Sequence, residues 1–197
     1  MASRLHRRSA ALLATALVAT LVGACAPGVD ASFDPTGACS GDGSAVGAYP
    51  DLEARIPTSY EGVGPGRLDS GRSCSKENLG TLADAGYTEV RFAGGTWDFG
   101  GDRAAALVVF TAKGLTAAQI ADFYASSAQA ANRTTVTGRS TPTLAGRPGQ
   151  RLDTETGDRT QVIVAWPAAD PDVVNVVIAN ELPDTKIQAA VDAFGGR

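Results

Sequence analysis

The stretch TQVIVAWPAADPDVVNVVIAN, residues 160–180, decides the fold of this chain. Two apolar runs, Thr160–Trp166 and Val173–Asn180, are separated by a six-residue segment, Pro167–Asp172, that is rich in proline and aspartate. A connection of this length joins neighbouring strands only when they run antiparallel. Both runs carry apolar residues on both faces, as strands covered on two sides do. The sequence therefore predicts a sheet with a buried, antiparallel centre.

Further strand patterns lie on the N-terminal side of this centre. Ala105–Thr111 is apolar on both faces, and Tyr87–Phe92 alternates apolar with polar residues, which is typical of a half-buried strand. Gly157 and Asp158 predict the turn that leads into Thr160. Weaker strands are expected over residues 60–68, 133–137 and 150–154.

Helical patterns predict the elements that cover the sheet. Thr116 and Gln119 have the spacing of a capping box, and an apolar stripe predicts a helix over Ala117–Ala131. A last helix is predicted after a cap at Asp184, a shorter one over residues 76–85, and one helical turn within residues 51–57. The predicted fold is α+β: a single, mainly antiparallel β-sheet with about three packed helices. The stripe of the long helix is interpreted as core and consists of Ile120, Phe123, Tyr124, Ala128 and Ala131.

The first residues of the chain have the layout of a secretory signal peptide. Arg4, Arg7 and Arg8 form a basic tip, and residues 10–22 are almost unbroken alanine, leucine, valine and threonine. This apolar run is shorter than the roughly 20 residues of a membrane-spanning helix. Residues 1–24 are therefore predicted to be a signal peptide that is removed.

The signal ends in Val22-Gly23-Ala24-Cys25, which resembles the lipobox of bacterial lipoproteins. The resemblance implies that Cys25 receives a diacylglyceryl group on sulfur, that cleavage follows Ala24, and that the new N-terminus is acylated, with palmitate as a typical chain. Two or three acyl chains hold a protein stably at a membrane. The alternatives are ordinary secretion, with cleavage at a small-residue site around Ala24, and an uncleaved anchor.

The three cysteines, Cys25, Cys39 and Cys74, fit this interpretation. An exported protein with three thiols has one left over, and lipidation of Cys25 accounts for it. Cys39 and Cys74 are then expected to form a disulfide in an oxidising compartment. Residues 25–49 are rich in small and polar residues and are expected to form a lipid-anchored flexible tether. Residues 50–197 are expected to form a single globular domain.

Charge and composition limit the partners of the processed chain. Removal of residues 1–24 takes away three of the 17 basic residues and none of the 21 acidic ones, which leaves a net charge of −7. An acidic domain repels phosphate backbones, so nucleic acid is not expected as a partner. No polybasic patch adds to membrane binding, so the acyl group is expected to hold the chain at the extracytoplasmic face of the cell membrane. The excess of arginine over lysine, with abundant alanine and glycine, is typical of high-GC bacteria such as actinobacteria.

Histidine occurs only at His6, inside the predicted signal peptide. The processed chain therefore lacks the residue that a Ser-His-Asp triad, a Cys-His pair or a His-ligated zinc or iron site requires. A disulfide between Cys39 and Cys74 would also remove thiolate catalysis. Residues 153–158 resemble the start of a calcium loop, but the distal glutamate is absent at the required spacing, so a hairpin tip is favoured. No catalytic residue, metal site or cofactor is predicted, and an enzyme is not favoured.

The segment Gly94–Asp102 (GGTWDFGGD) is the candidate ligand-binding loop. Its glycine-framed backbone carries two aromatic residues, Trp97 and Phe99, and two acids, Asp98 and Asp102. Such a loop is able to stack on a sugar or an apolar ligand. The alternative, which is favoured, is a hairpin whose aromatic rings fold back into the core.

Together these observations favour a non-enzymatic binding or interaction domain, held by lipid at the cell envelope. Its expected partners are an envelope protein, a small amphiphile or a wall glycan, and the anchor makes the membrane itself a partner. A hydrolase of cell-wall glycans built on two carboxylates is one alternative, because the chain holds 21 acidic residues. A structural or sensor role as the accessory of an exported partner is another.

Overall fold

A computed structural model describes residues 33–195 and contains a large sheet with helices packed on it. The strands are β1 (Gly43–Ala45), β2 (Arg67–Ser73), β3 (Val90–Asp98), β4 (Ala104–Thr111), β5 (Thr134–Ser140), β6 (Thr143–Leu144), β7 (Arg147–Pro148), β8 (Gln150–Thr156), β9 (Arg159–Pro167) and β10 (Val173–Asn180). The helices are α1 (Pro50–Glu53), α2 (Lys76–Leu79), α3 (Thr81–Asp84), α4 (Ala117–Ala130) and α5 (Asp184–Ala193). The predicted signal peptide, Cys25 and the residues up to position 32 lie outside the described part of the chain.

The predicted α+β class is confirmed. Eight strands form one sheet in the order β1-β2-β3-β4-β10-β9-β8-β5, and every neighbouring pair is antiparallel. β6 and β7 form a separate small hairpin. Within residues 33–195 no helix is long and apolar enough to cross a membrane.

The predicted centre of the sheet forms as expected. β10 has the bounds that the sequence indicates, and β9 extends the predicted run by one residue at each end. β10 pairs on one side with β4, where Val176 faces Val108, and on the other side with β9, where Val177 faces Val164. These valines are almost fully buried, as strands covered on both faces require.

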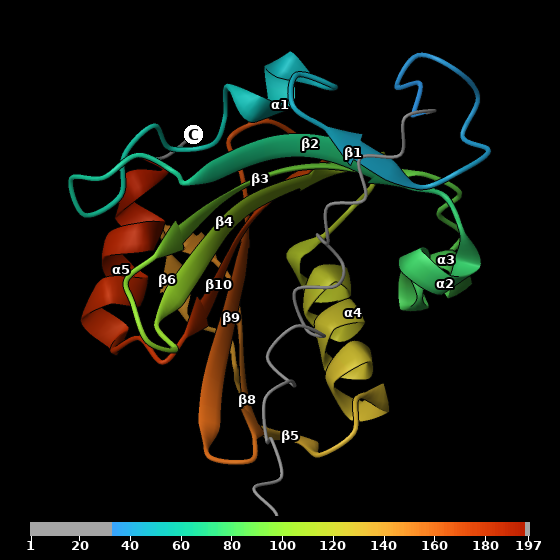
Figure 1. The fold of residues 1–197 in the computed structure, drawn as a ribbon. Coiled ribbons are helices and arrows are strands. Elements are labelled where there is room, and N and C mark those ends of the chain that lie inside the picture. The colour runs from blue at the N-terminus through green and yellow to red at the C-terminus, as the bar shows by residue number, and fades with distance from the viewer. Residues whose placement is uncertain (1–32, 196–197) are drawn as a thin grey trace, which may run out of the picture.

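The two faces of the sheet carry two separate apolar cores (Figure 1). One face packs against α5 and α1, through residues such as Ile187 and Val191 of α5 and Phe194, which follows it. The other face packs against α4 and the α2–α3 pair, through Ile120, Leu79 and their neighbours. Alternate residues of each central strand enter alternate cores, because side chains of a strand point to opposite faces.

The two longest helices start near the positions that the sequence predicts. In α4 the capping box is complete, since Thr116 Oγ1 accepts from the Gln119 N–H and the Gln119 side chain reaches back to the Thr116 N–H. α5 differs in detail, because Pro183 occupies the N-cap and Asp184 is the first helical residue. The Asp184 carboxylate does not cap the helix but accepts a hydrogen bond from Arg151 at 2.9 Å.

The helix predicted over residues 76–85 is wrong in one respect, because it is interrupted at Gly80. That residue has φ of +50° and separates α2 from α3, each of four residues. Glycine adopts a positive φ at little energetic cost. Leu79 of α2 and Leu82 of α3 both enter the core.

The sequence also missed β2 and expected only a weak edge strand over residues 60–68. β2 escapes pattern recognition because its sequence, RLDSGRS, is mostly polar. Ser70 and Arg72 are nevertheless buried, with hydrogen bonds from Ser70 Oγ to Glu53 and from the Arg72 guanidinium to main-chain carbonyls. Tertiary hydrogen bonds therefore hold this strand where an apolar pattern would normally do so.

The folded part of the chain begins before Pro50, where the sequence placed the domain boundary. Gly43–Ala45 pairs with β2 as the edge strand β1, and residues 33–42 pack beside it over Arg72. We call residues 33–42 the N-terminal strap. The second half of the predicted tether is therefore part of the domain.

The contact between β1 and β2 yields a stability prediction. A Cβ added at Gly71 would lie 2.2 Å from the Gly43 carbonyl oxygen and 2.8 Å from the Phe92 ring. We expect Gly71→Ala to displace β1 and to lower the free energy of unfolding by about 2–3 kcal/mol, as overpacking does. Gly66→Ala is the matched control, because the nearest atom to its Cβ would be 3.7 Å away. Urea unfolding of the two variants measures the difference, and equal stability would contradict the contact.

Candidate functional site

A small apolar cavity lies between the α2–α3 pair and the sheet. Its volume is about 30 Å³. It is lined by Ser73, Asn78, Leu79, Leu82, Val90, Phe92, Phe110 and Phe123. Six of these eight side chains are apolar and two are polar.

The cavity lies between the helices that cover one face of the sheet, where α4 meets the α2–α3 pair. α4 lies mainly against β5, β8, β9 and β10, so it covers little of the β3–β4 part of the same face. The connection from β2 to β3, which contains α2 and α3, fills that part (Figure 1). We call residues 75–86 the lid. Leu79 and Leu82 of the lid close the cavity above Val90 and Phe92 of β3.

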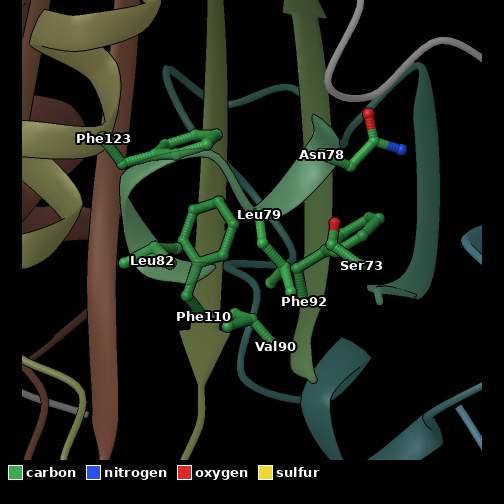
Figure 2. A pocket seen from close by; sticks show the side chains of 8 residues that line it. All are labelled: Ser73, Asn78, Leu79, Leu82, Val90, Phe92, Phe110 and Phe123. Carbon is green, nitrogen blue, oxygen red and sulfur yellow. The ribbon is translucent and has the colours of Figure 1, made fainter. Parts of the chain in front are cut away.

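Figure 2 shows how the lining side chains are arranged. Phe123 and Leu82 lie on one side of the cavity, and Ser73 and Asn78 lie together on the other. The polar groups are thus gathered at one end of the cavity, next to the start of the lid.

A row of aromatic rings lies at the cavity, and all of them except Tyr124 line it. Phe92 lies 6.3 Å from Phe110 between ring centroids, Phe110 lies 6.4 Å from Tyr124, and Tyr124 lies 5.2 Å from Phe123. Phe110, Phe123 and Tyr124 are only partly buried. Partly exposed, contiguous rings beside a cavity are a feature of surfaces that bind apolar ligands.

The polar end of the cavity is fixed by Asp42. Its carboxylate accepts hydrogen bonds from the backbone N–H groups of Cys74 and Ser75. Burial alone would raise the pKa of Asp42, but the hydrogen bonds from Ser75 and from the Cys74 N–H outweigh it and hold the pKa below its usual value. Asp42 is therefore ionised at neutral pH and holds the first residues of the lid.

The predicted disulfide between Cys39 and Cys74 is confirmed. Its Cα atoms are 5.7 Å apart, and it closes a segment of 35 residues between the strap and the start of the lid. A disulfide is typical of proteins outside the cytoplasm. The bridge and Asp42 attach to adjacent residues, Cys74 and Ser75, so both connect the strap to the lid.

Trp97 does not lie in a loop, and its ring takes the alternative arrangement, within the core. Trp97 belongs to β3 and is 2% exposed, and its Nε1 donates to the Val63 carbonyl at 2.8 Å. The glycines before it make room for the ring, because a Cβ at Gly95 would lie 2.9 Å from the indole. The glycine pair that suggested flexible backbone thus serves close packing inside a strand.

The other predicted loop residues are spread around the β3–β4 turn. Asp98 accepts from the Gly100 N–H at 2.8 Å, and Asp102 forms a 3.2 Å ion pair with Arg159. Phe99 packs edge-on against Tyr60, with 5.5 Å between ring centroids. Ligand binding by Trp97, Asp98, Phe99 and Asp102 stays a prediction, although Trp97 offers no exposed ring for it.

Tyr60 anchors this region to α5 rather than to a ligand. Its hydroxyl donates to the Lys186 carbonyl at 3.0 Å, and its ring packs edge-on against Trp97. Burial, with a smaller effect of the nearby Glu61, raises the pKa of Tyr60 to about 12. The tyrosine is therefore neutral at physiological pH and serves the fold.

A second, polar hollow of about 410 Å³ lies beside Arg91 and Lys113 at the end of β3 and β4. Arg91 is already engaged, because Glu89 accepts from its Nε at 2.7 Å and its guanidinium lies 5.1 Å from the centroid of the Tyr49 ring. The hydrogen bond from Arg91 to Glu89 raises the pKa of Arg91 despite partial burial. The charge of Arg91 is thus balanced within the domain.

The cavity residues were only partly visible in the sequence. The stripe of α4 placed Phe123 and Tyr124 on the buried side, and Phe92 ended a predicted strand. That these residues meet Leu79 and Leu82 depends on the register between β3 and β4 and on the path of the lid, which no local pattern contains. The glycine at position 80 was the sequence signal that residues 76–85 do not form one continuous helix.

Comparison with protein-family models and with curated proteins finds no match to this chain. Within residues 33–195 no group of three or more histidine, cysteine, aspartate or glutamate side chains is placed to hold a metal ion. The function therefore has to be argued from the chemistry of the domain.

Proposed function

We propose that this chain is a lipid-anchored, extracytoplasmic protein that binds a small amphiphile. The row of partly buried rings beside the apolar cavity carries the proposal, because Phe110, Phe123 and Tyr124 keep part of their surface in contact with solvent. The apolar part of the ligand enters beside Phe110 and Phe123, and its polar end lies at Ser73 and Asn78.

An amphiphile suits this site better than a glycan. A sugar is bound through many hydrogen bonds to its hydroxyl groups, whereas only two polar side chains line the cavity, and no carboxylate does. The residues needed for a hydrolase of glycans are accordingly not gathered there. The cavity of about 30 Å³ has to widen before it admits an acyl chain, and Phe123, which is only partly buried, is a side chain that is able to move aside.

The proposed anchor places the cavity close to a source of amphiphiles. Phe33 already packs on the domain, where its ring lies 5.7 Å from the Arg72 guanidinium. Eight residues of extended chain reach at most about 28 Å, so a domain acylated at Cys25 stays near the bilayer surface. In this proposal the domain captures the apolar chain of its ligand at or near the bilayer surface.

A fluorescent fatty acid, 11-(dansylamino)undecanoic acid, tests the proposed ligand class. The exported Cys25→Ala variant cannot be acylated at position 25. We expect this variant to bind the probe with a Kd in the micromolar range. Ser73→Phe fills the polar end of the cavity and is expected to weaken binding at least tenfold, or about 1.4 kcal/mol. Ser140→Phe on the exposed strand β5 is the matched control and is expected to bind as the parent does.

Competition distinguishes the ligand classes. Undecanoic acid is expected to displace the probe, and a cell-wall disaccharide is not. No binding of the probe by either the oxidised or the dithiothreitol-reduced chain, or equal binding by the Ser73→Phe and Ser140→Phe chains, would refute the proposed site.

Intact-mass analysis of the native chain tests the anchor. We expect a chain that starts at Cys25 and carries diacylglyceryl and acyl groups, and we expect Cys25→Ala to release the protein from the membrane fraction. A native chain with an unmodified N-terminus would refute the anchor but not the cavity.

A further inference from the structure

We propose that the Cys39–Cys74 disulfide is a latch on the lid, and that opening it admits the amphiphile to the apolar cavity. The identity of the ligand rests on the proposed function, whereas the latch itself rests on the contacts between the strap and the lid. Three features of the structure support it: a strap that is fixed to the sheet, a lid that is joined to the strap at one corner, and a hinge within the lid.

The strap is fixed to the sheet by Arg72. This side chain is 4% exposed, and its guanidinium donates to three main-chain carbonyls of the strap, those of Gly37 at 2.8 Å and of Asp34 and Ala38 at 3.0 Å each. The Tyr49 hydroxyl donates to a further strap carbonyl, of Pro35, at 3.3 Å. A buried arginine that satisfies several carbonyls holds a loop firmly, because removal of either partner leaves buried polar groups without hydrogen bonds.

The lid is joined to this fixed strap at its first corner. Ser73 is the last residue of β2 and lines the cavity, and the next residue, Cys74, carries the bridge to Cys39. Asp42 of the strap accepts the backbone N–H groups of Cys74 and Ser75 and thus reinforces the same corner. The bridge therefore fixes the point from which the lid leaves the sheet.

The lid contains a hinge that lets it move once this corner is free. Its two helices have four residues each, too few for independent stability, and Gly80 between them has φ of +50°. Leu79 and Leu82 hold the lid down by apolar contacts, which an incoming apolar chain is able to replace. Beyond the lid, the Tyr87 hydroxyl donates to Gln119 of α4 at 3.0 Å and keeps the far end in place.

Opening the latch requires a two-electron reduction by an external dithiol. The dithiol attacks the bridge, the Cys39–Cys74 bond breaks, both residues end as protonated thiols, and the dithiol becomes a disulfide. Cys39 and Cys74 are both partly exposed, which gives such a reagent access. The reduction is reversible, because both thiols are kept, and reoxidation restores the bridge and the closed lid.

Alkylation of an engineered thiol tests the latch without any ligand. In the exported Cys25→Ala chain, Val90→Cys places a thiol in the cavity, and Val109→Cys places one in the opposite core. The two valines are 2% and 0% exposed, so they form a matched pair. We expect replacement of Cys39 and Cys74 by serine to accelerate iodoacetamide labelling at position 90 at least tenfold and to leave position 109 unchanged. An unchanged rate at position 90, or equal acceleration at both positions, would overturn the latch.

Probe binding before and after treatment with dithiothreitol tests the link to the ligand. We expect the reduced Cys25→Ala chain to bind 11-(dansylamino)undecanoic acid at least tenfold more tightly than the oxidised chain. Equal binding in both states overturns the control of binding by the bridge and leaves the proposed function standing. No binding in either state, together with faster labelling at position 90, refutes the proposed function and supports the latch.

Discussion

The structure depends on a sheet that is apolar on both faces and therefore needs a cover on both sides. β4, β9 and β10 send alternate side chains into two separate cores. α5 and α1 cover one face, whereas α4, about 21 Å long by its residue count, covers mainly the β5–β10 side of the other. The remaining area above β3 and β4 is left to a lid of two short helices. The cavity and its aromatic rings lie where this cover is thinnest.

The second constraint is the burial of polar residues in β2. Arg72 would be costly inside the domain without partners, and the strap supplies them as three main-chain carbonyls. The same strap carries Cys39 and Asp42, which hold the start of the lid. A single segment thus supplies acceptors to both terminal nitrogens of a buried guanidinium, leads into the edge strand β1 and fixes the cover of the cavity. This explains why a stretch with the composition of a tether belongs to the folded domain.

The sequence predicted what local patterns encode. The strand pair around Pro167–Asp172, the capping box of α4 and the pairing of Cys39 with Cys74 all appear in the structure, because each depends on neighbouring residues or on a simple count. It failed at β2, where buried polar residues depend on distant carbonyls. For Trp97 it left two arrangements open, and the favoured one, with the ring in the core, is the one that forms, with room above Gly95. The cavity needs the register of β3 with β4 and the path of the lid, and both are tertiary properties.

Hydrogen exchange followed by mass spectrometry measures the central claim, that the thin cover over β3 and β4 is held closed from the strap. The comparison is between the oxidised chain and the chain in which serines replace Cys39 and Cys74. Amides of residues 75–86 are predicted to exchange faster without the bridge, whereas those of β4 and β10 keep their protection. Unchanged exchange over residues 75–86, or equal loss of protection in β4 and β10, would contradict the account.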